Sequence, residues 1–213
     1  DGNIELIVER SNFRRCYSGK FGGGVYASSA NNSFSQLCFA ECSAADSSDD
    51  SGHAAYLACK SNEYKTLVTK CSITQCPIAG IGADSCICVT SSTEELTLSN
   101  FTNNKVKIRE IFQSGCTQNF PMSLSSFANC TGAIMQTFAQ VADIDTCVMV
   151  SNIDIPSGNG IVQLQNGGEI RNTIYSNNNH GKFYIGTNPT VKSCFFCGNG
   201  FNPPGTEDCI GFT

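Results

Sequence analysis

The chain has 213 residues, a formal net charge of −5 and a pI near 5.0. Hydrophobic residues make up 40% and charged residues only 15%, so the composition predicts a folded domain whose surface is built largely from Ser, Thr, Asn, Gln and Gly. The acidic balance argues against nucleic acid or an anionic membrane as the main partner, because both require a concentrated positive field. No run of about 18 apolar residues occurs, so no segment is predicted to span a bilayer.

A degenerate phrase of nine residues recurs eight times along the chain. Its pattern is an apolar residue, two variable residues, a small residue, one variable residue, a second apolar residue, two variable residues, and Cys or Asn. In chain order the copies are VERSNFRRC (8–16), FSQLCFAEC (34–42), VTKCSITQC (68–76), LTLSNFTNN (96–104), MSLSSFANC (122–130), IDTCVMVSN (144–152), EIRNTIYSN (169–177) and VKSCFFCGN (191–199). A β-rich repeat of roughly 20 to 30 residues is typical of a solenoid, in which each unit packs on its neighbours.

Short segments that follow the phrases predict further strands, because they are rich in β-branched or aromatic residues and often open with Gly. They are GGGVYA (22–27), HAAYLAC (53–59), DSCICV (84–89), KVKIREI (105–111), TGAIMQ (131–136), GIVQLQ (160–165) and GKFYIG (181–186). No helical periodicity is present. We therefore predict an all-β fold, a single-stranded right-handed parallel β-helix of about eight coils over residues 1–200. Pro203-Pro204-Gly205 cannot continue a central strand, so residues 201–213 are predicted to form a short irregular C-terminal cap or tail.

Stacking of the coils about 4.8 Å apart would place equivalent phrase positions above one another as columns. The predicted interior apolar column is Phe13, Phe39, Ile73, Phe101, Phe127, Met149, Ile174 and Phe196. The small column, two residues earlier, is Ser11, Leu37, Cys71, Ser99, Ser125, Cys147, Asn172 and Cys194. The phrase ends form a corner column of Cys16, Cys42, Cys76, Asn104, Cys130, Asn152, Asn177 and Asn199. At the corner we expect Asn to adopt the left-handed conformation and to hydrogen-bond its neighbours.

The chain contains 14 Cys residues, a density that indicates disulfides in an oxidising compartment or metal binding in a reducing one. Zinc sites use clustered pairs such as CxxC. Only Cys194 and Cys197 have that spacing, and the two His residues are isolated, so we predict disulfides, no metal and no cofactor. The candidate disulfide cysteines are Cys16, Cys42, Cys71, Cys76, Cys194 and Cys197. We expect pairs between neighbouring coils, such as Cys16 with Cys42.

The phrase FTNN (101–104) with KVKI, FANC with TGAIM, and FRRC with GGGVY resemble the FxxN and GGAI repeats of the polymorphic outer-membrane proteins. The resemblance covers residues 4–200. It implies a secreted or surface-displayed β-helix that acts as an adhesin or a scaffold and is not an enzyme. We therefore expect an extracellular or cell-surface protein that binds a glycan or a host or matrix protein through a strand face or loops. An alternative is a filament or matrix subunit that self-associates end to end.

Three groups of residues are candidates for more specific roles. Asn31 and Asn100 each begin an Asn-x-Ser/Thr sequence and are candidate glycosylation sites. Lys105, Lys107 and Arg109 alternate along one strand and could face an acidic glycan. Asp143 and Asp145 flank Ile144 and could point the same way from one strand, which leaves a polysaccharide lyase or hydrolase as the enzyme alternative. We predict no catalytic residues.

Overall fold

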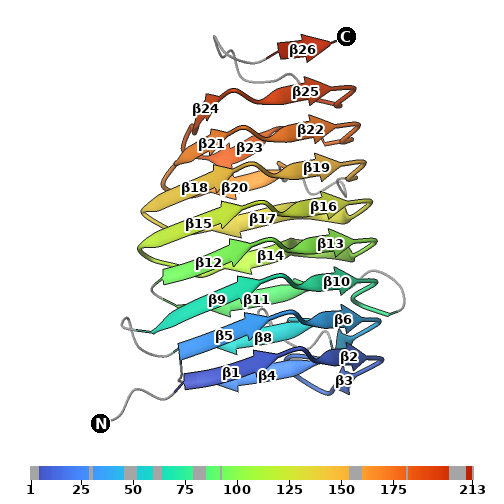
Figure 1. Ribbon diagram of the computed structural model, residues 1–213. Coiled ribbons are helices and arrows are strands. Elements are labelled where there is room, and N and C mark those ends of the chain that lie inside the picture. Colours follow the sequence, from blue (N-terminus) through green and yellow to red (C-terminus); the bar gives the residue numbers. More distant parts are fainter. Residues whose placement is uncertain are drawn as a thin grey trace.

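The computed structural model describes residues 5–28, 31–45, 52–59, 64–78, 85–91, 93–153, 160–180, 182–201 and 210–212. Over these residues the protein is all-β, and its strands stack into a parallel β-solenoid with three long sheets (Figure 1). The strand pairs run parallel throughout this part of the chain. The described segments include no helix long and apolar enough to cross a membrane.

Each long sheet takes one strand from each successive coil. The first sheet contains β1 (Glu5–Glu9), β5 (Asn31–Ser35), β9 (Lys65–Thr69), β12 (Thr93–Thr97), β15 (Asn119–Ser123), β18 (Val141–Asp145), β21 (Glu169–Arg171) and β24 (Thr190–Lys192). The second contains β2 (Asn12–Arg14), β6 (Cys38–Ala40), β10 (Ser72–Thr74), β13 (Asn100–Thr102), β16 (Ser126–Ala128), β19 (Val148–Val150), β22 (Ile174–Ser176), β25 (Phe195–Cys197) and β26 (Ile210–Phe212). The third contains β4 (Val25–Ser28), β8 (Ala55–Ala58), β11 (Ile87–Thr90), β14 (Lys105–Ser114), β17 (Thr131–Thr137), β20 (Val162–Leu164) and β23 (Tyr184–Gly186). A small fourth sheet pairs β3 (Tyr17–Ser18) with β7 (Ser43–Ala44).

The predicted right-handed parallel β-helix is confirmed. From the blue N-terminal coil to the red C-terminal coil, the nearer strands rise from left to right and the more distant strands return (Figure 1), the hand that twisted parallel strands favour. In the described residues, seven coils contribute a strand to every long sheet, and the coil of β24 and β25 contributes to two. The number of complete coils is therefore slightly below the eight expected.

Each phrase bends twice, because its third and eighth residues have positive φ. These are almost all non-glycine residues, with φ between 48° and 57°. The predicted left-handed corner residue therefore lies one position before the phrase end: Asn103 has φ of 55°, whereas Asn104 is fully buried and turns its side chain inward. Asn177 is predicted to end the seventh phrase. It has positive φ because that phrase begins at Ile170, as shown below, which makes Asn177 its eighth residue.

The apolar column forms the core of the solenoid. Phe13 stacks on Phe39 with ring centroids 4.9 Å apart, and Phe101 stacks on Phe127 at 4.6 Å. The column lies in the second sheet, where Phe39 also pairs in register with Ile73. Such offset-stacked rings add to the stabilisation that burial alone provides.

The seventh copy of the phrase begins at Ile170, one residue later than predicted. Tyr175, and not Ile174, pairs in register with Met149 and is fully buried, whereas Ile174 is 43% exposed. In the same way Thr173 replaces Asn172 in the small column, and Asn178 replaces Asn177 in the corner column. The reason is that the inward-facing Ile170 begins this phrase, while Glu169 faces outward. A shift of one residue exchanges the two faces of a strand.

The structure describes Phe201 and residues 210–212 of the predicted C-terminal cap. Phe201 is 8% exposed and stacks on Phe183 with ring centroids 5.5 Å apart. β26 pairs in parallel with β25 and so adds a further strand to the second sheet. The extent of a cap over the whole of 201–213 stays a prediction.

Alanine substitutions at the two neighbouring residues of β22 test the corrected register. Tyr175→Ala should lower the free energy of unfolding by about 3–5 kcal/mol, because it empties a stacked core position. Ile174→Ala should change it by less than about 0.5 kcal/mol, because that side chain faces solvent. Urea denaturation followed by circular dichroism measures both, and a larger loss for Ile174→Ala would restore the original register.

Candidate binding site

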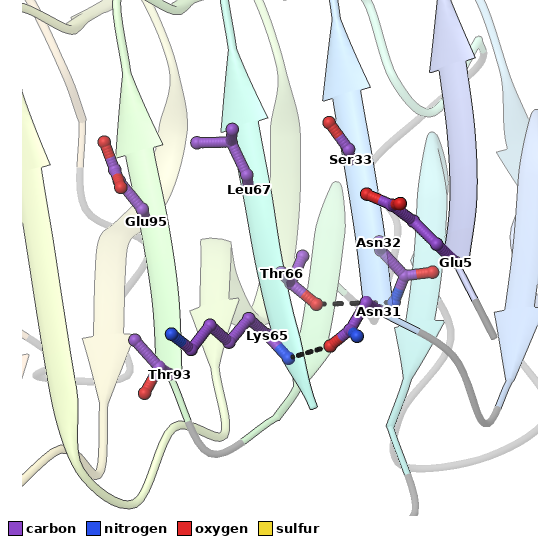
Figure 2. Close-up of a pocket in the computed structure, with 9 residues that line it drawn as sticks. All are labelled: Glu5, Asn31, Asn32, Ser33, Lys65, Thr66, Leu67, Thr93 and Glu95. Atoms are coloured by element: carbon purple, nitrogen blue, oxygen red, sulfur yellow. Dashed lines mark hydrogen bonds between the residues drawn. The ribbon is translucent and has the colours of Figure 1, made fainter. Parts of the chain in front are cut away.

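A pocket of about 630 Å³ lies on the first sheet, across its first four strands. It is lined by Glu5, Asn31, Asn32, Ser33, Lys65, Thr66, Leu67, Thr93 and Glu95 (Figure 2). Its volume falls in the range of roughly 300–1,000 Å³ that is usual for small-molecule sites.

The stacking of the coils builds the pocket from two rows of outward-facing side chains. Glu5 pairs in register with Asn31, and Lys65 pairs with Thr93, which gives the row at the strand starts. Ser33, Leu67 and Glu95 form the second row two residues further along. Because side chains alternate between the two faces of a strand, these rows point to the same side.

Hydrogen bonds hold the floor of the pocket. Asn31 Oδ1 accepts from the backbone N–H of Lys65 at 2.8 Å. Asn32 faces the interior, is only 3% exposed, and its Nδ2 donates to Thr66 Oγ1 at 3.3 Å and to Cys59 Sγ at 3.2 Å. Its Oδ1 is buried and has no hydrogen-bond partner, an arrangement that is costly for a buried polar atom.

The two carboxylates of the pocket stand far apart. Glu5 lies in the first strand of the sheet and Glu95 in the fourth, so three strand spacings, about 14 Å, separate them. Paired carboxylates that hydrolyse glycosidic bonds stand about 5–9.5 Å apart. Glu5 and Glu95 therefore cannot act together on one such bond.

Behind the pocket lies Glu94, a buried carboxylic acid that the sequence analysis missed. It pairs in register with Thr66, is 1% exposed, and accepts from the backbone N–H of Ser91 at 3.0 Å. Burial raises the pKa of Glu94 to about 8, so the group is largely protonated at neutral pH. The alternation of the strand TEELT contained the signal, because Leu96 points inward and Glu94 lies two residues before it.

The structure places the predicted cysteines in three positions. Cys16, Cys42 and Cys76 occupy the corner column in successive coils, and the backbone N–H of Cys42 donates to Cys76 Sγ at 3.4 Å. Cys71 and Cys194 lie in the small column, and Cys197 is half-buried in β25. Cys16, Cys42, Cys71, Cys76 and Cys197 are thiols here. Neighbouring strands lie at a spacing that a disulfide can bridge, and the cross-link of Cys16 with Cys42 stays a prediction.

In the corner column, the Cys thiols make the same hydrogen bonds as the Asn amides of other coils. Asn104 Nδ2 donates to the carbonyl of Ile73 in the preceding coil at 3.0 Å, and Cys130 Sγ donates to that of Phe101 at 3.6 Å. The backbone N–H of Cys130 in turn donates to Asn152 Oδ1 at 3.0 Å. Burial raises the pKa of the Cys130 thiol to about 11, so it remains a donor at neutral pH. Cys therefore substitutes for Asn in one continuous ladder.

Asp143 and Asp145 do point the same way from β18, and both bind Arg171. Arg171 Nη1 lies 2.8 Å from Asp143 Oδ1, and its Nε lies 3.0 Å from Asp145 Oδ2. The Asn172 amide, together with Thr146 and Arg171, holds the pKa of Asp145 below its usual range. A general acid needs a raised pKa, so Asp145 is a poor candidate for that role.

The remaining predicted residues lie apart from one another. Asn100 is exposed in β13, where its Oδ1 accepts from Ser126 Oγ at 2.7 Å. Lys105 is exposed at the start of β14, and the side chains of Lys107 and Arg109 are outside the described part. Among the described residues, no group of three or more His, Cys, Asp or Glu side chains is arranged to hold a metal ion.

Glu94→Gln should remove a pH dependence of stability. The pKa of Glu94 is raised from 4.5 to about 8, so its contribution is fully present below about pH 4.5 and is lost as the pH rises through 8. Thermal unfolding between pH 5 and 9 measures this loss. Glu95→Gln, at the exposed neighbour, is the control and should keep the wild-type profile; an unchanged profile for Glu94→Gln would contradict the assignment.

Exchange of Cys130 tests the mixed ladder. Cys130→Asn should leave the free energy of unfolding within about 1 kcal/mol of wild type, because Asn makes the equivalent bonds at positions 104 and 152. Cys130→Val should lose about 1–3 kcal/mol, because the buried polar groups around it lose their partner. If denaturant titration finds Val tolerated as well as Asn, the thiol does not belong to the ladder.

Comparison of the chain with protein-family models, with curated proteins and with solved structures finds no match. The function must therefore be argued from the solenoid and its pocket.

Proposed function

We propose that this protein is an extracellular, non-catalytic β-helix that binds a glycan in the pocket on its first sheet. The pocket itself carries this proposal, because four successive coils line it with hydrogen-bonding groups at a regular spacing. Binding sites of this kind combine an apolar surface with a few placed polar groups that fix orientation.

The side chains of the pocket match the chemistry of a sugar chain. Asn31, Ser33 and Thr93 offer amide and hydroxyl groups, Lys65 offers an ammonium, and Leu67 offers a small apolar surface between them. A sugar presents hydroxyls that donate and accept, beside C–H groups that pack on apolar atoms. A chain of sugars that lies along the stacking direction meets these groups coil after coil.

The carboxylates favour binding over catalysis. Glu5 and Glu95 are separated by about 14 Å, and Asp143 and Asp145 are engaged with Arg171. Glu5 and Glu95 stand farther apart than two carboxylates that cleave one glycosidic bond together, and the lowered pKa of Asp145 does not suit a general acid. This supports adhesion over the lyase or hydrolase alternative.

The resemblance to polymorphic outer-membrane proteins supports display at a cell surface. Of the two candidate glycosylation sites, Asn31 lines the pocket, and a glycan attached there would fill it. Asn100 lies in the second sheet and is exposed. We therefore propose Asn100 as the acceptor that is compatible with an open pocket.

A glycan array, followed by calorimetric titration of the best ligand, tests the proposal. Ser33→Phe should weaken binding by at least about tenfold, because the added ring fills the floor of the pocket. Ser123→Phe is the matched control, since Ser123 is also half-buried in the first sheet but lies outside the pocket, and it should bind as wild type. Absence of binding to every glycan, or unchanged binding by Ser33→Phe, would refute the proposal.

A further inference from the structure

We infer that a second pocket of this protein binds an acidic sugar, whose anionic substituent pairs with the ammonium of Lys105. This site is separate from the pocket on the first sheet and goes beyond the function proposed above. Its volume is about 410 Å³, and it is lined by Gln75, Pro77, Ile78, Asn103 and Lys105. The size falls in the range of roughly 300–1,000 Å³ that is usual for small-molecule sites.

Two neighbouring coils build this second pocket at the corner where the second sheet turns into the third. Gln75 follows β10 and Asn103 follows β13, and these two strands are neighbours in the second sheet (Figure 1). Pro77 and Lys105 come two residues later in the same coils. The second pocket therefore consists of matching positions in successive coils, as the first pocket does.

The corner column fixes the backbone beneath the second pocket. Cys76 and Asn104, which alternate in sequence with the lining residues, are fully buried. The backbone N–H of Cys76 donates to Asn104 Oδ1 at 2.9 Å, and Asn104 Nδ2 donates to the carbonyl of Ile73 at 3.0 Å. Gln75 and Asn103 have positive φ, and their backbone N–H groups donate to carbonyls of the next coil. The lining side chains are thus carried by a backbone that the stack holds in place.

The side chains of the second pocket suit a sugar that carries a negative charge. Gln75, Asn103 and Lys105 are exposed, and within the described part of the chain their side chains form no hydrogen bond or ion pair. The two amides can donate to and accept from sugar hydroxyls, and the ammonium can form charge-assisted bonds with a carboxylate or a sulfate. Buried Pro77 and the exposed Ile78 add apolar surface for the C–H groups of the sugar.

The charge of the second pocket favours an anion. Among its described lining residues, Lys105 alone is charged. Glu41 occupies the corner position one coil before Gln75, but its carboxylate is ion-paired with Arg14 and Arg15 of the preceding coil. The first pocket, in contrast, carries two carboxylates beside one ammonium. An acidic sugar should therefore bind at the second pocket in preference to the first.

Three synthetic oligosaccharides of the same length and linkage test the inference, because they differ only at carbon 6 of each sugar. They are oligomers of galacturonic acid, galactose 6-sulfate and galactose, titrated calorimetrically into the wild-type protein and into Ser33→Phe, in which the first pocket is filled. At least one acidic oligomer should bind about tenfold more tightly than the galactose oligomer to both proteins, and the better of the two identifies the substituent. Its advantage should shrink as salt is raised.

Substitutions in the second pocket should remove this advantage. Lys105→Gln should weaken binding of the acidic oligomer about tenfold by removing the charge, whereas Lys70→Gln, at an exposed residue outside both pockets, should bind as wild type. Asn103→Gly keeps the positive φ without strain and should weaken binding about threefold or more by removing the amide. Asn129→Gly, at the equivalent bend of the next coil, is its matched control and should not.

Two results would overturn the inference: equal binding of acidic and neutral oligomers, or unchanged binding of the acidic oligomer by Lys105→Gln. If binding of the acidic oligomer is lost in Ser33→Phe but kept in Lys105→Gln, the acidic sugar occupies the first pocket. That result would also overturn the inference, while glycan binding in the first pocket would stand.

Discussion

The whole solenoid depends on the hydrogen bonds that join each corner to the corner of the next coil. A non-glycine residue with positive φ is unfavourable by about 1 kcal/mol or more, and this protein places two in nearly every coil. In the coils before the last, such residues are compensated by a repeated bond: the N–H of Arg15 donates to the carbonyl of Ala40 at 3.0 Å, and that of Asn103 donates to Ala128 at 3.1 Å. The strain is therefore tolerable only in a stack, and an isolated coil would not keep its shape.

Next to these bends, the corner column shows how one structural need is met by two residue types. The position requires a small side chain that donates a hydrogen bond to a carbonyl of the preceding coil. The same side chain also accepts a hydrogen bond from a backbone N–H of that coil. Asn104 and Asn152 do so with an amide, and Cys42 and Cys130 do so with a thiol. Much of the cysteine content is thus explained by hydrogen bonding inside the stack, whether or not neighbouring thiols are later joined. The same exchange occurs in the small column, where Ser99 and Cys71 both donate to the carbonyl two residues earlier.

The stack also explains how outward-facing strand residues of successive coils can line one pocket. Outward side chains repeat at the strand spacing, so a pocket needs only a set of coils with suitable residues in the same two columns. Coils one to four supply such a set, and coils six and seven place Asp143, Asp145 and Glu169 around Arg171 instead. Under the proposed function, binding specificity resides in residues that the repeat leaves variable, while the recurring phrase positions keep the coils in register.

Sequence alone determined the class of fold, because the phrase repeats at a period typical of a solenoid, its segments are β-rich, and its apolar positions are mostly unambiguous. It did not determine register in the seventh coil, where Ile174 and Tyr175 are both apolar and Asn177 and Asn178 are identical, so either frame fits the phrase. Only the stacking of Tyr175 between its neighbours in the second sheet decided the frame. The pocket was likewise unreadable from the sequence, since Glu5, Asn32, Lys65 and Glu95 come from four separated segments. These residues lie together because of the length of each coil and the register in which successive strands pair. Both are set by long-range contacts of the tertiary structure, which a local sequence pattern does not contain.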